Sequence, residues 1–259
     1  MAFLDLMTAA VGGGALVKIL DYAVSEYRRR SELKRSVRHT VDRHMDPILK
    51  SGDDLVGKLR SLALEDFKSC DRFSKFCAED FTNYVPLGSV IYLFAHFWGR
   101  LAILRHEGLY VELGETQAGA KLKIFIDELE TRGVRVVDRA WQRGIGEAIT
   151  RSQGDHYTCL TFHGFIREHA EDKRFRQWFY PLVDVLKNTN KTQIRQKVLL
   201  YGVVIHAMLD TLDPNHHVVR DRPSYPNKLS KKTRRVLRYR VFKEYLTCVK
   251  GIEKYLDQK

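Results

Sequence analysis

The densest group of residues that could bind a charged partner lies near the C-terminus. It consists of seven basic side chains with Tyr239 among them: Lys228, Lys231, Lys232, Arg234, Arg235, Arg238 and Arg240. Lysine and arginine at this density suit the phosphates of nucleic acids or of lipid headgroups. A solvated helix face has a similar composition. The cluster therefore predicts an anionic partner surface, with a solvated face as the alternative.

The charge of the chain is distributed unevenly and supports this prediction. The net charge is +12, and the stretch from Arg220 to Lys259 holds 13 basic and 4 acidic residues, so it carries nine of these charges. Such asymmetry localises an anionic partner to the C-terminal end. Membrane headgroups are favoured as the partner if the N-terminus is anchored. Nucleic acid is the alternative, and no zinc-finger spacing or RNA-binding aromatic motif supports it.

An uncharged run near the N-terminus indicates contact with a membrane. The twelve residues from Leu6 to Val17 lack a charge, and three arginines follow them: Arg28, Arg29 and Arg30. A helix that spans a membrane needs about 20 mainly apolar residues. Residues 2–20 are long enough if the charges at positions 5 and 18 lie at opposite membrane interfaces. The arginines would keep the rest of the chain cytoplasmic. We therefore expect an N-terminal anchor that inserts or lies in the interface, with both basic groups facing one anionic leaflet; a soluble helix is the alternative.

Two pairs of titratable residues suggest a small-ligand or catalytic site. Arg143 and Glu147 are one helical turn apart in QRGIGE, and His206 and Asp210 have the same spacing. The preferred explanation is structural for both pairs: a buried ion pair for the first, and a helix end followed by a turn for the second. The glycines of QRGIGE do not follow a strand, so they are not a dinucleotide loop.

Metal binding and known catalytic motifs find little support in the sequence. His156, Cys159, His163 and His169 are metal-capable, and Cys159 and His163 would share a face on a helix, but their spacing matches no common zinc pattern. No CxxC, G-x-S-x-G, H-E-x-x-H or P-loop motif occurs. We predict no metal, no cofactor and no disulfide, and an enzyme only of an unrecognised class.

The elements that would position these residues are almost all helical. The clearest helix has apolar residues at spacings of three and four, and it ends before Asp213-Pro214; the stripe is Ile194, Val198, Tyr201, Ile205, Met208 and Leu212. A second helix is predicted to begin at Asp46-Pro47, where the aspartate would cap the first turn. The uncharged stretch from Phe81 to Gly99 is divided by Pro86 and Gly88. It predicts a core helix from about Gly88 rather than a second membrane span.

The predicted architecture is all-α: an irregular multi-helix bundle with a long N-terminal helix and a basic C-terminal helix. Only Val134–Val137 has the composition of a strand. We expect four regions, namely a hydrophobic N-terminal segment with a basic helical stalk (1–45), a helical body (46–214), a linker rich in proline and histidine (215–227), and the basic C-terminal helix (228–259).

Several segments resemble a group of uncharacterised bacterial proteins. They are DPILKSGDDLVGKL from Asp46, YLFAHFWGRLAILRHEGLYVELG from Tyr92, QRGIGEAI from Gln142, WFYPLVDVL from Trp178 and MLDTLDP from Met208. This chain departs from the group's pattern at Arg100, His106 and Trp141, where the pattern has an aromatic or polar residue, an arginine and a glutamate. Many members begin with a short hydrophobic segment and a basic helix. The resemblance implies an N-terminal anchor and no particular activity.

Together these observations predict a membrane-associated helical binding or scaffold protein on the cytoplasmic face, with an unidentified protein partner. The first alternative is a soluble nucleic-acid-binding protein that uses the C-terminal helix. The second is an enzyme centred near Glu147 or near His206 and Asp210.

Overall fold

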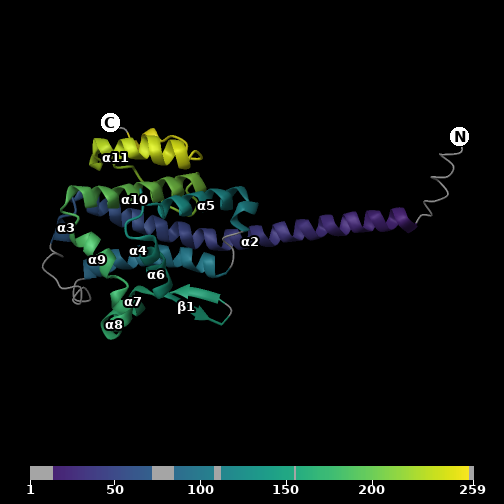
Figure 1. The fold of residues 1–259 in the computed structure, drawn as a ribbon, viewed down its shortest axis with the longest axis horizontal. Coiled ribbons are helices and arrows are strands. Elements are labelled where there is room, and N and C mark those ends of the chain that lie inside the picture. Colours follow the sequence, from purple (N-terminus) through teal and green to yellow (C-terminus); the bar gives the residue numbers. More distant parts are fainter. Residues whose placement is uncertain (1–13, 72–84, 108–111, 155, 257–259) are drawn as a thin grey trace.

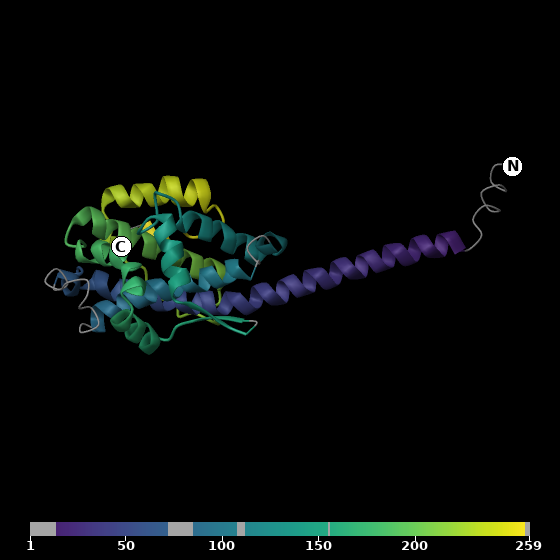
Figure 2. The same ribbon diagram turned by 60° about the horizontal axis from the view of Figure 1, so that its bottom comes forward.

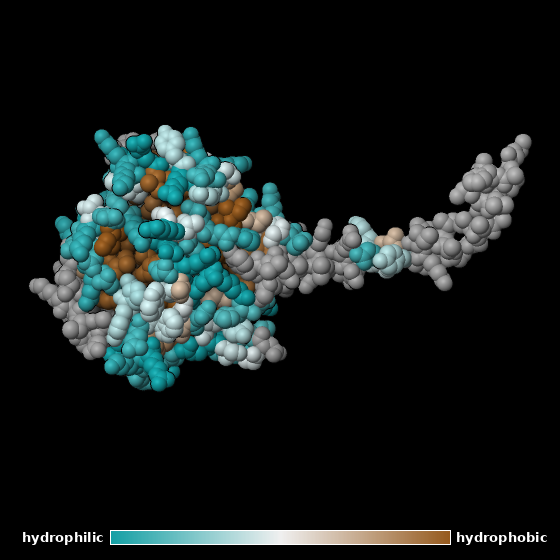
Figure 3. All heavy atoms as spheres, viewed as in Figure 1, coloured by the Kyte–Doolittle hydropathy of each residue, from teal (hydrophilic) through white to brown (hydrophobic). Residues whose placement is uncertain are grey.

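The computed structural model describes residues 14–71, 85–107, 112–154 and 156–256, and it confirms an all-α fold with one short hairpin. A helical body carries one long helix that projects away from it (Figure 1). Figure 3 shows hydrophilic residues over most of this face of the body, with hydrophobic areas exposed between them.

The projecting helix is α2, which runs without a break from Gly14 to Leu64. Its first half leaves the body and its second half passes through the core (Figures 1 and 2). Val41 is the first described buried residue, and Ile48, Leu55 and Leu59 continue the buried face. We call residues 14–40 the stalk. The anchor predicted at residues 2–20 lies largely outside the described residues.

The predicted helix start at Asp46-Pro47 is wrong, because Pro47 lies inside α2. A proline in a helix interior removes one backbone hydrogen bond and costs about 3 kcal/mol. Ile48, Leu55 and Leu59 are fully or almost fully buried on the far side of this position. Burying a side chain of this kind contributes roughly 1.5–3 kcal/mol. Packing of α2 in the core therefore outweighs the local cost of Pro47.

The other helices of the body pack on α2 and on one another. Their bounds are α3 Lys68–Asp71, α4 Val85–His106, the 3-10 helix η3 Glu112–Glu115, α5 Gln117–Leu129, α6 Arg139–Ala148, α7 Phe162–Glu171, α8 Lys173–Gln177, α9 Tyr180–Lys187 and α10 Thr192–Leu212. Side-chain oxygens of Thr116, Asp138 and Thr161 cap α5, α6 and α7. The observed bounds of α10 confirm the helix predicted from its apolar stripe.

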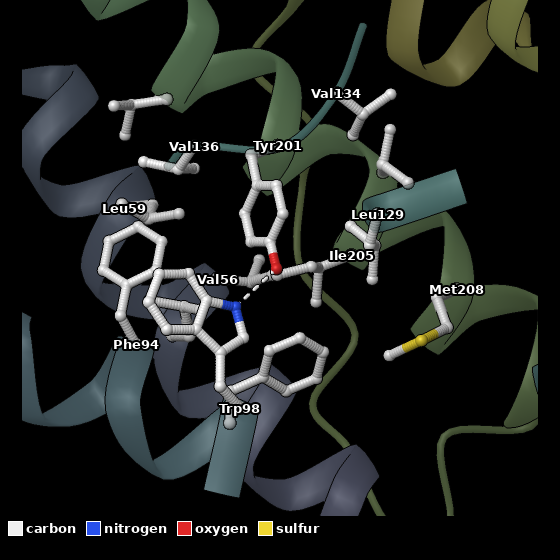
Figure 4. Packing of buried hydrophobic residues seen from close by; sticks show 14 of the residues in the cluster. Val56, Leu59, Phe94, Trp98, Leu129, Val134, Val136, Tyr201, Ile205 and Met208 are labelled. Carbon is white, nitrogen blue, oxygen red and sulfur yellow. Dashed lines mark hydrogen bonds between the residues drawn. The ribbon is translucent and has the colours of Figure 1, made fainter. Parts of the chain in front are cut away.

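Helix α4 is the centre of the core and contacts α2, α6 and the hairpin. Among the described residues one helix is long and apolar enough to cross a membrane, Leu87–His106 within α4, and most of that stretch is buried in the body. In Figure 4 the indole of Trp98 donates a hydrogen bond of 2.7 Å to the Tyr201 hydroxyl of α10. The core helix predicted from about Gly88 is thus confirmed.

The backbones of α4 and α6 are in direct contact at Gly146. A Cβ atom at Gly146 would lie 2.5 Å from the carbonyl oxygen of Trp98. Only a residue without a side chain fits there, and the close contact brings α6 and the following hairpin against α4.

The short hairpin replaces the predicted strand. Strands β1 (Thr150–Gln153) and β2 (His156–Cys159) pair antiparallel, with Thr150 opposite Cys159. Val134–Val137 instead forms a buried turn between α5 and α6, so the strand prediction is wrong. Its valines are buried by the surrounding helices and not by strand pairing. Cys159 lies in β2 and His163 in α7, so the shared helical face expected for them does not exist.

The predicted linker at 215–227 packs along the body. Both carboxylate oxygens of Asp213 accept hydrogen bonds from backbone N–H groups of the turn that follows α10. Val219 and Tyr225 are buried, and Arg222 reaches Asp53 on α2. This segment is therefore fixed to α2 by both apolar and charged contacts.

The predicted basic C-terminal helix is not continuous. The chain forms the 3-10 helix η4 (Pro226–Lys228), α11 (Lys231–Arg235), the π-helix η5 (Val236–Tyr245) and α12 (Glu253–Leu256). A turn around Gly251, whose φ is +63°, separates η5 from α12. Within these elements Val241 and Leu256 are buried, whereas Tyr245 is exposed. These elements pack along the side of the body formed by α5 and α10 (Figure 1).

Candidate anion-binding cavity

A cavity of about 290 Å³ lies where α2 enters the body, between α2, α4 and β2. Its charged and titratable lining residues are Arg43, His44, Arg100, Glu107, His156 and Tyr157. Its apolar lining residues are Pro47, Ile48 and Ile103. In Figure 2 the hairpin extends beside the point where the stalk leaves the body. The cavity is therefore at the base of the stalk.

Three elements bring the lining residues together. Arg43, His44 and Pro47 lie on consecutive turns of α2 just after its first described buried residue, Val41. Arg100, Ile103 and Glu107 of α4 are spaced three and four apart, so they share one helical face. His156 and Tyr157 begin β2, and the Tyr157 ring stacks on His106 with centroids 5.3 Å apart.

Glu107 organises one side of the cavity. Its carboxylate accepts a hydrogen bond of 3.0 Å from the Arg43 guanidinium, and His44 Nε2 lies 2.8 Å from the same oxygen. Burial lowers the pKa of His44, and the charges of Arg43 and Arg100 lower it further, which outweighs the opposing effect of Glu107. His44 is therefore neutral at pH 7.

Arg100 provides the other charge, and it has no carboxylate partner among the described residues. Its side chain is partly buried, and its Nε is buried without a hydrogen-bond acceptor. Burial, with a smaller contribution from the Arg100 charge, lowers the pKa of neighbouring His96 to about 4. With Arg43, Arg100 and one carboxylate, the described lining is net positive.

The thiol closest to this site is not a nucleophile. Burial raises the pKa of Cys159 to about 11, although the charge of Arg100 opposes the shift. A thiol with such a pKa is protonated at neutral pH and unreactive. The cavity is thus equipped to bind an anion and not to form a covalent bond through Cys159.

The predicted pair of Arg143 and Glu147 does not form, because Arg143 turns to Glu130 instead. Glu147 is exposed, whereas the Glu130 side chain is only 3% exposed. Glu130 accepts from Arg143 at 2.6 Å, Arg139 at 2.9 Å and Arg105 at 2.5 Å. Burial alone would raise the pKa of Glu130, but the arginines lower it overall. These four side chains join α4 and α6 to the turn that follows α5. The space between them is too small for a ligand.

The predicted pair of His206 and Asp210 exists and holds the C-terminal elements. His206 Nε2 lies 3.7 Å from the Asp210 carboxylate, which accepts hydrogen bonds from Lys254 and from the Tyr255 hydroxyl of α12. Burial is the main cause that lowers the pKa of His206. Asp210 therefore docks α12 on α10.

The predicted basic residues of the C-terminal elements differ in their ion pairs and in their burial. Lys228 pairs with Asp66, and Arg238 makes two hydrogen bonds to Glu253. Arg234 is partly buried, and the exposed residues with no ion pair among the described residues are Lys231, Lys232, Arg235 and Arg240. We call these four the C-terminal cations.

The arginines predicted near the N-terminus lie on the stalk. Arg28 is exposed, and the side chains of Arg29 and Arg30 lie outside the described ones. The C-terminal elements lie on the body, whereas positions 28–30 lie on the part of α2 that projects from it (Figures 1 and 2), so the structure does not bring the two basic groups together.

The predicted metal-capable residues do not meet either. Within the described ranges, no three histidine, cysteine or acidic side chains are arranged to hold a metal ion. His169 is buried beside Phe165 and Phe179, and burial lowers its pKa to about 3. The uncharged form of His169 belongs to the core.

No family model, curated protein or solved structure matches this chain. The resemblance to a group of bacterial proteins therefore stays a prediction. Of the cavity residues, only His156 had been considered for chemistry from the sequence, and then as a metal ligand. No local pattern connects His44, Arg100 and His156, which are more than fifty positions apart.

Proposed function

We propose that this protein is a membrane-anchored helical binding protein whose body works at a distance from the cytoplasmic face of a membrane. The observation that carries the proposal is α2, a single helix whose first half projects from the body and whose second half belongs to the core (Figures 1 and 2). At about 1.5 Å per residue, the 27 residues of the stalk span roughly 40 Å.

The order of sequence features along the stalk supports a membrane at its tip. In the sequence, the uncharged run Leu6–Val17 comes first and includes the first four residues of the stalk, and the arginines at positions 28–30 follow it. Basic residues within about 15–20 positions of a membrane segment favour the cytoplasmic side. The body would then stand in the cytoplasm, where its helices offer binding surfaces to a protein partner.

This proposal changes the role expected for the C-terminal cations. They lie along the side of the body, whereas the uncharged run precedes the far end of the stalk (Figure 1). At 0.1 M salt, charges on the membrane are screened beyond roughly 10 Å. If the stalk stands perpendicular to the membrane, the distance from these cations to the membrane is well above that length. In the proposed arrangement the cations therefore meet a partner in the cytoplasm and not the leaflet that holds the anchor.

A second candidate function rests on the same cations. Tyr239 is 57% exposed, and Lys243 Nζ lies 5.1 Å from its ring centroid. An exposed aromatic ring among unpaired cations suits single-stranded nucleic acid, whose bases stack while its phosphates are neutralised. Binding of RNA by the body alone would favour this function.

Membrane fractionation of the full chain tests the anchor. We expect the parent protein to sediment with membranes and to require detergent for release, and a chain that lacks residues 1–24 to be soluble with an unchanged melting temperature. Ala10→Asp with Val11→Asp should also release the protein, because each charge costs roughly 2.5–3.5 kcal/mol at a bilayer centre.

Ser25→Asp is the matched control, since it adds a charge to an exposed position of the stalk and should leave the protein on the membrane. A full-length protein that stays soluble without detergent would refute the anchor. So would equal membrane retention of the double aspartate variant and the parent.

A further inference from the structure

We propose that the cavity at the base of the stalk binds a small phosphomonoester, with Arg100 and Arg43 holding the phosphate. This inference is independent of the membrane anchor, because it rests only on side chains of α2, α4 and β2. The cavity has a volume of about 290 Å³, near the lower end for small-molecule sites and larger than an inorganic anion needs.

The unpaired charge of Arg100 is the first step of the argument. A guanidinium that is partly withdrawn from water normally pairs with a carboxylate or another acceptor. Arg100 has no such partner in the described chain, and its Nε is buried without an acceptor. An oxyanion in the cavity would supply the missing acceptor, and the planar guanidinium can bind it with two parallel hydrogen bonds.

Arg43 supplies a second guanidinium to the lining of the cavity. It uses one N–H group on Glu107 and leaves its other donors for a ligand. Glu107 also approaches His44, so the one carboxylate of the described lining is already engaged on the α2 side. A dianionic phosphate is favoured over a monoanionic carboxylate because the lining holds two guanidinium groups.

The remaining walls indicate that the phosphate carries an organic group. Pro47, Ile48 and Ile103 are apolar, and the partly exposed Tyr157 ring stacks on His106. Small-molecule sites commonly combine such apolar walls with a few charged groups. Arg43, His156 and Tyr157 are exposed, so a ligand can reach the cavity from solvent.

A bound phosphomonoester would connect three elements that are separate in the chain. Arg43 belongs to the turn of α2 at which the stalk meets the body, Arg100 to the central helix α4 and Tyr157 to the hairpin. A ligand that binds only the folded state stabilises it by mass action. Occupancy would thus hold the base of the stalk against α4 and the hairpin.

Calorimetric titration of the full chain, in detergent micelles, tests the proposal with three probes: phenyl phosphate, inorganic phosphate and benzoate. We expect phenyl phosphate to bind most tightly, since it fills both the charged and the aromatic parts of the cavity. Arg100→Gln should weaken phenyl phosphate and inorganic phosphate at least tenfold. Arg132→Gln removes the same charge from an exposed position outside the cavity and should leave both affinities unchanged.

Tyr157→Ala serves as a second variant, because its side chain is partly exposed and its loss should leave the fold intact. It should weaken phenyl phosphate and leave inorganic phosphate unchanged. The proposal is overturned if no probe binds the parent, if benzoate binds as tightly as phenyl phosphate, or if Arg132→Gln weakens binding as much as Arg100→Gln does.

Discussion

Arg222 and Asp53 form a two-point ion pair that joins the segment after α10 to the core half of α2. The guanidinium donates hydrogen bonds of 2.6 and 2.9 Å to the two carboxylate oxygens, and the side chains are 18% and 10% exposed. A Cβ atom at Gly57, one turn beyond Asp53, would lie 2.9 Å from a guanidinium nitrogen. The guanidinium therefore lies directly on the backbone of α2.

Asp53→Ala should destabilise the fold because it leaves this guanidinium largely buried without a partner. We expect a loss of about 2–3 kcal/mol in the free energy of unfolding. For a chain of this size each kcal/mol lowers the melting temperature by roughly 2–4 °C. Calorimetry measures the shift.

The more exposed pair of Lys123 and Asp127 on α5, whose side chains are 39% and 47% exposed, provides the control for this prediction, because surface pairs contribute at most about 1 kcal/mol. Asp127→Ala should therefore change stability less than Asp53→Ala does. Equal effects of the two substitutions would mean that the Arg222 contact is a surface interaction only.

Gly146→Ala should separate α4 from α6. The added methyl group would lie 2.5 Å from the Trp98 carbonyl oxygen, so the helices must move apart. Overpacking of this kind costs roughly 1–3 kcal/mol. The matched control is Gly114→Ala, where no atom lies within 4 Å of the new Cβ. Urea unfolding of both variants decides the matter, and a Gly146→Ala protein as stable as the control would disprove the close contact.

Glu128 should make stability fall as pH rises towards neutrality. Burial raises its pKa from 4.5 to about 7, so the folded protein retains a proton that the unfolded chain releases. The folded state then binds more protons between these two pH values, and its stability decreases across that window. Because glutamine cannot ionise, Glu128→Gln should be more stable than the parent at pH 8 by roughly 1–2 kcal/mol.

The advantage of Glu128→Gln should shrink as the pH is lowered to 4.5, where the parent carboxyl group is protonated in the folded protein. Glu147→Gln, at an exposed position of α6, is the matched control substitution. Melting temperatures recorded from pH 4.5 to 8 test this, and parallel curves for the parent and Glu128→Gln would count against the buried acid.

The C-terminal cations should account for most of the binding to anionic polymers. We expect replacement of all four by glutamine to weaken duplex DNA binding at least tenfold at about 0.1 M salt, where charges are screened beyond roughly 10 Å. The slope of log affinity against log salt should fall by up to about four units.

The control removes four exposed cations elsewhere: Arg132, Arg167, Lys173 and Arg174. Anisotropy titrations at several salt concentrations compare the two variants. If both lose the same affinity, binding depends on net charge alone, and the C-terminal cations form a solvated face.

The parts of the fold that the sequence predicted are those fixed by local patterns. The apolar stripe and Asp213-Pro214 defined α10 closely, because a buried helix face and a helix end both have local signals. Pro47 misled for the opposite reason, since its local preference was overruled by burial of Ile48 and Leu55. The resulting continuity of α2 is a tertiary effect.

The hairpin and the cavity were missed for a related reason. A four-residue strand such as Thr150–Gln153 gives little periodicity, and Gly154 between the strands, with φ of +60°, was the available turn signal. Arg143 precedes Glu147 by one helical turn but pairs with Glu130, because the fold brings the more buried carboxylate of Glu130 within its reach. The cavity depends on contacts between α2, α4 and β2, which no single segment encodes.

The unbroken course of α2 also fixes a rotational relationship. In a regular helix each added residue lengthens the axis by about 1.5 Å and turns everything beyond it by about 100°. One residue inserted between Tyr22 and Arg28 would barely change the distance to the tip, yet it would point a different side of the body in any given direction. Seven inserted residues would add about 10 Å and nearly restore the original orientation. The number of residues in α2 therefore sets the direction in which the cavity and the C-terminal cations face around the axis of the stalk.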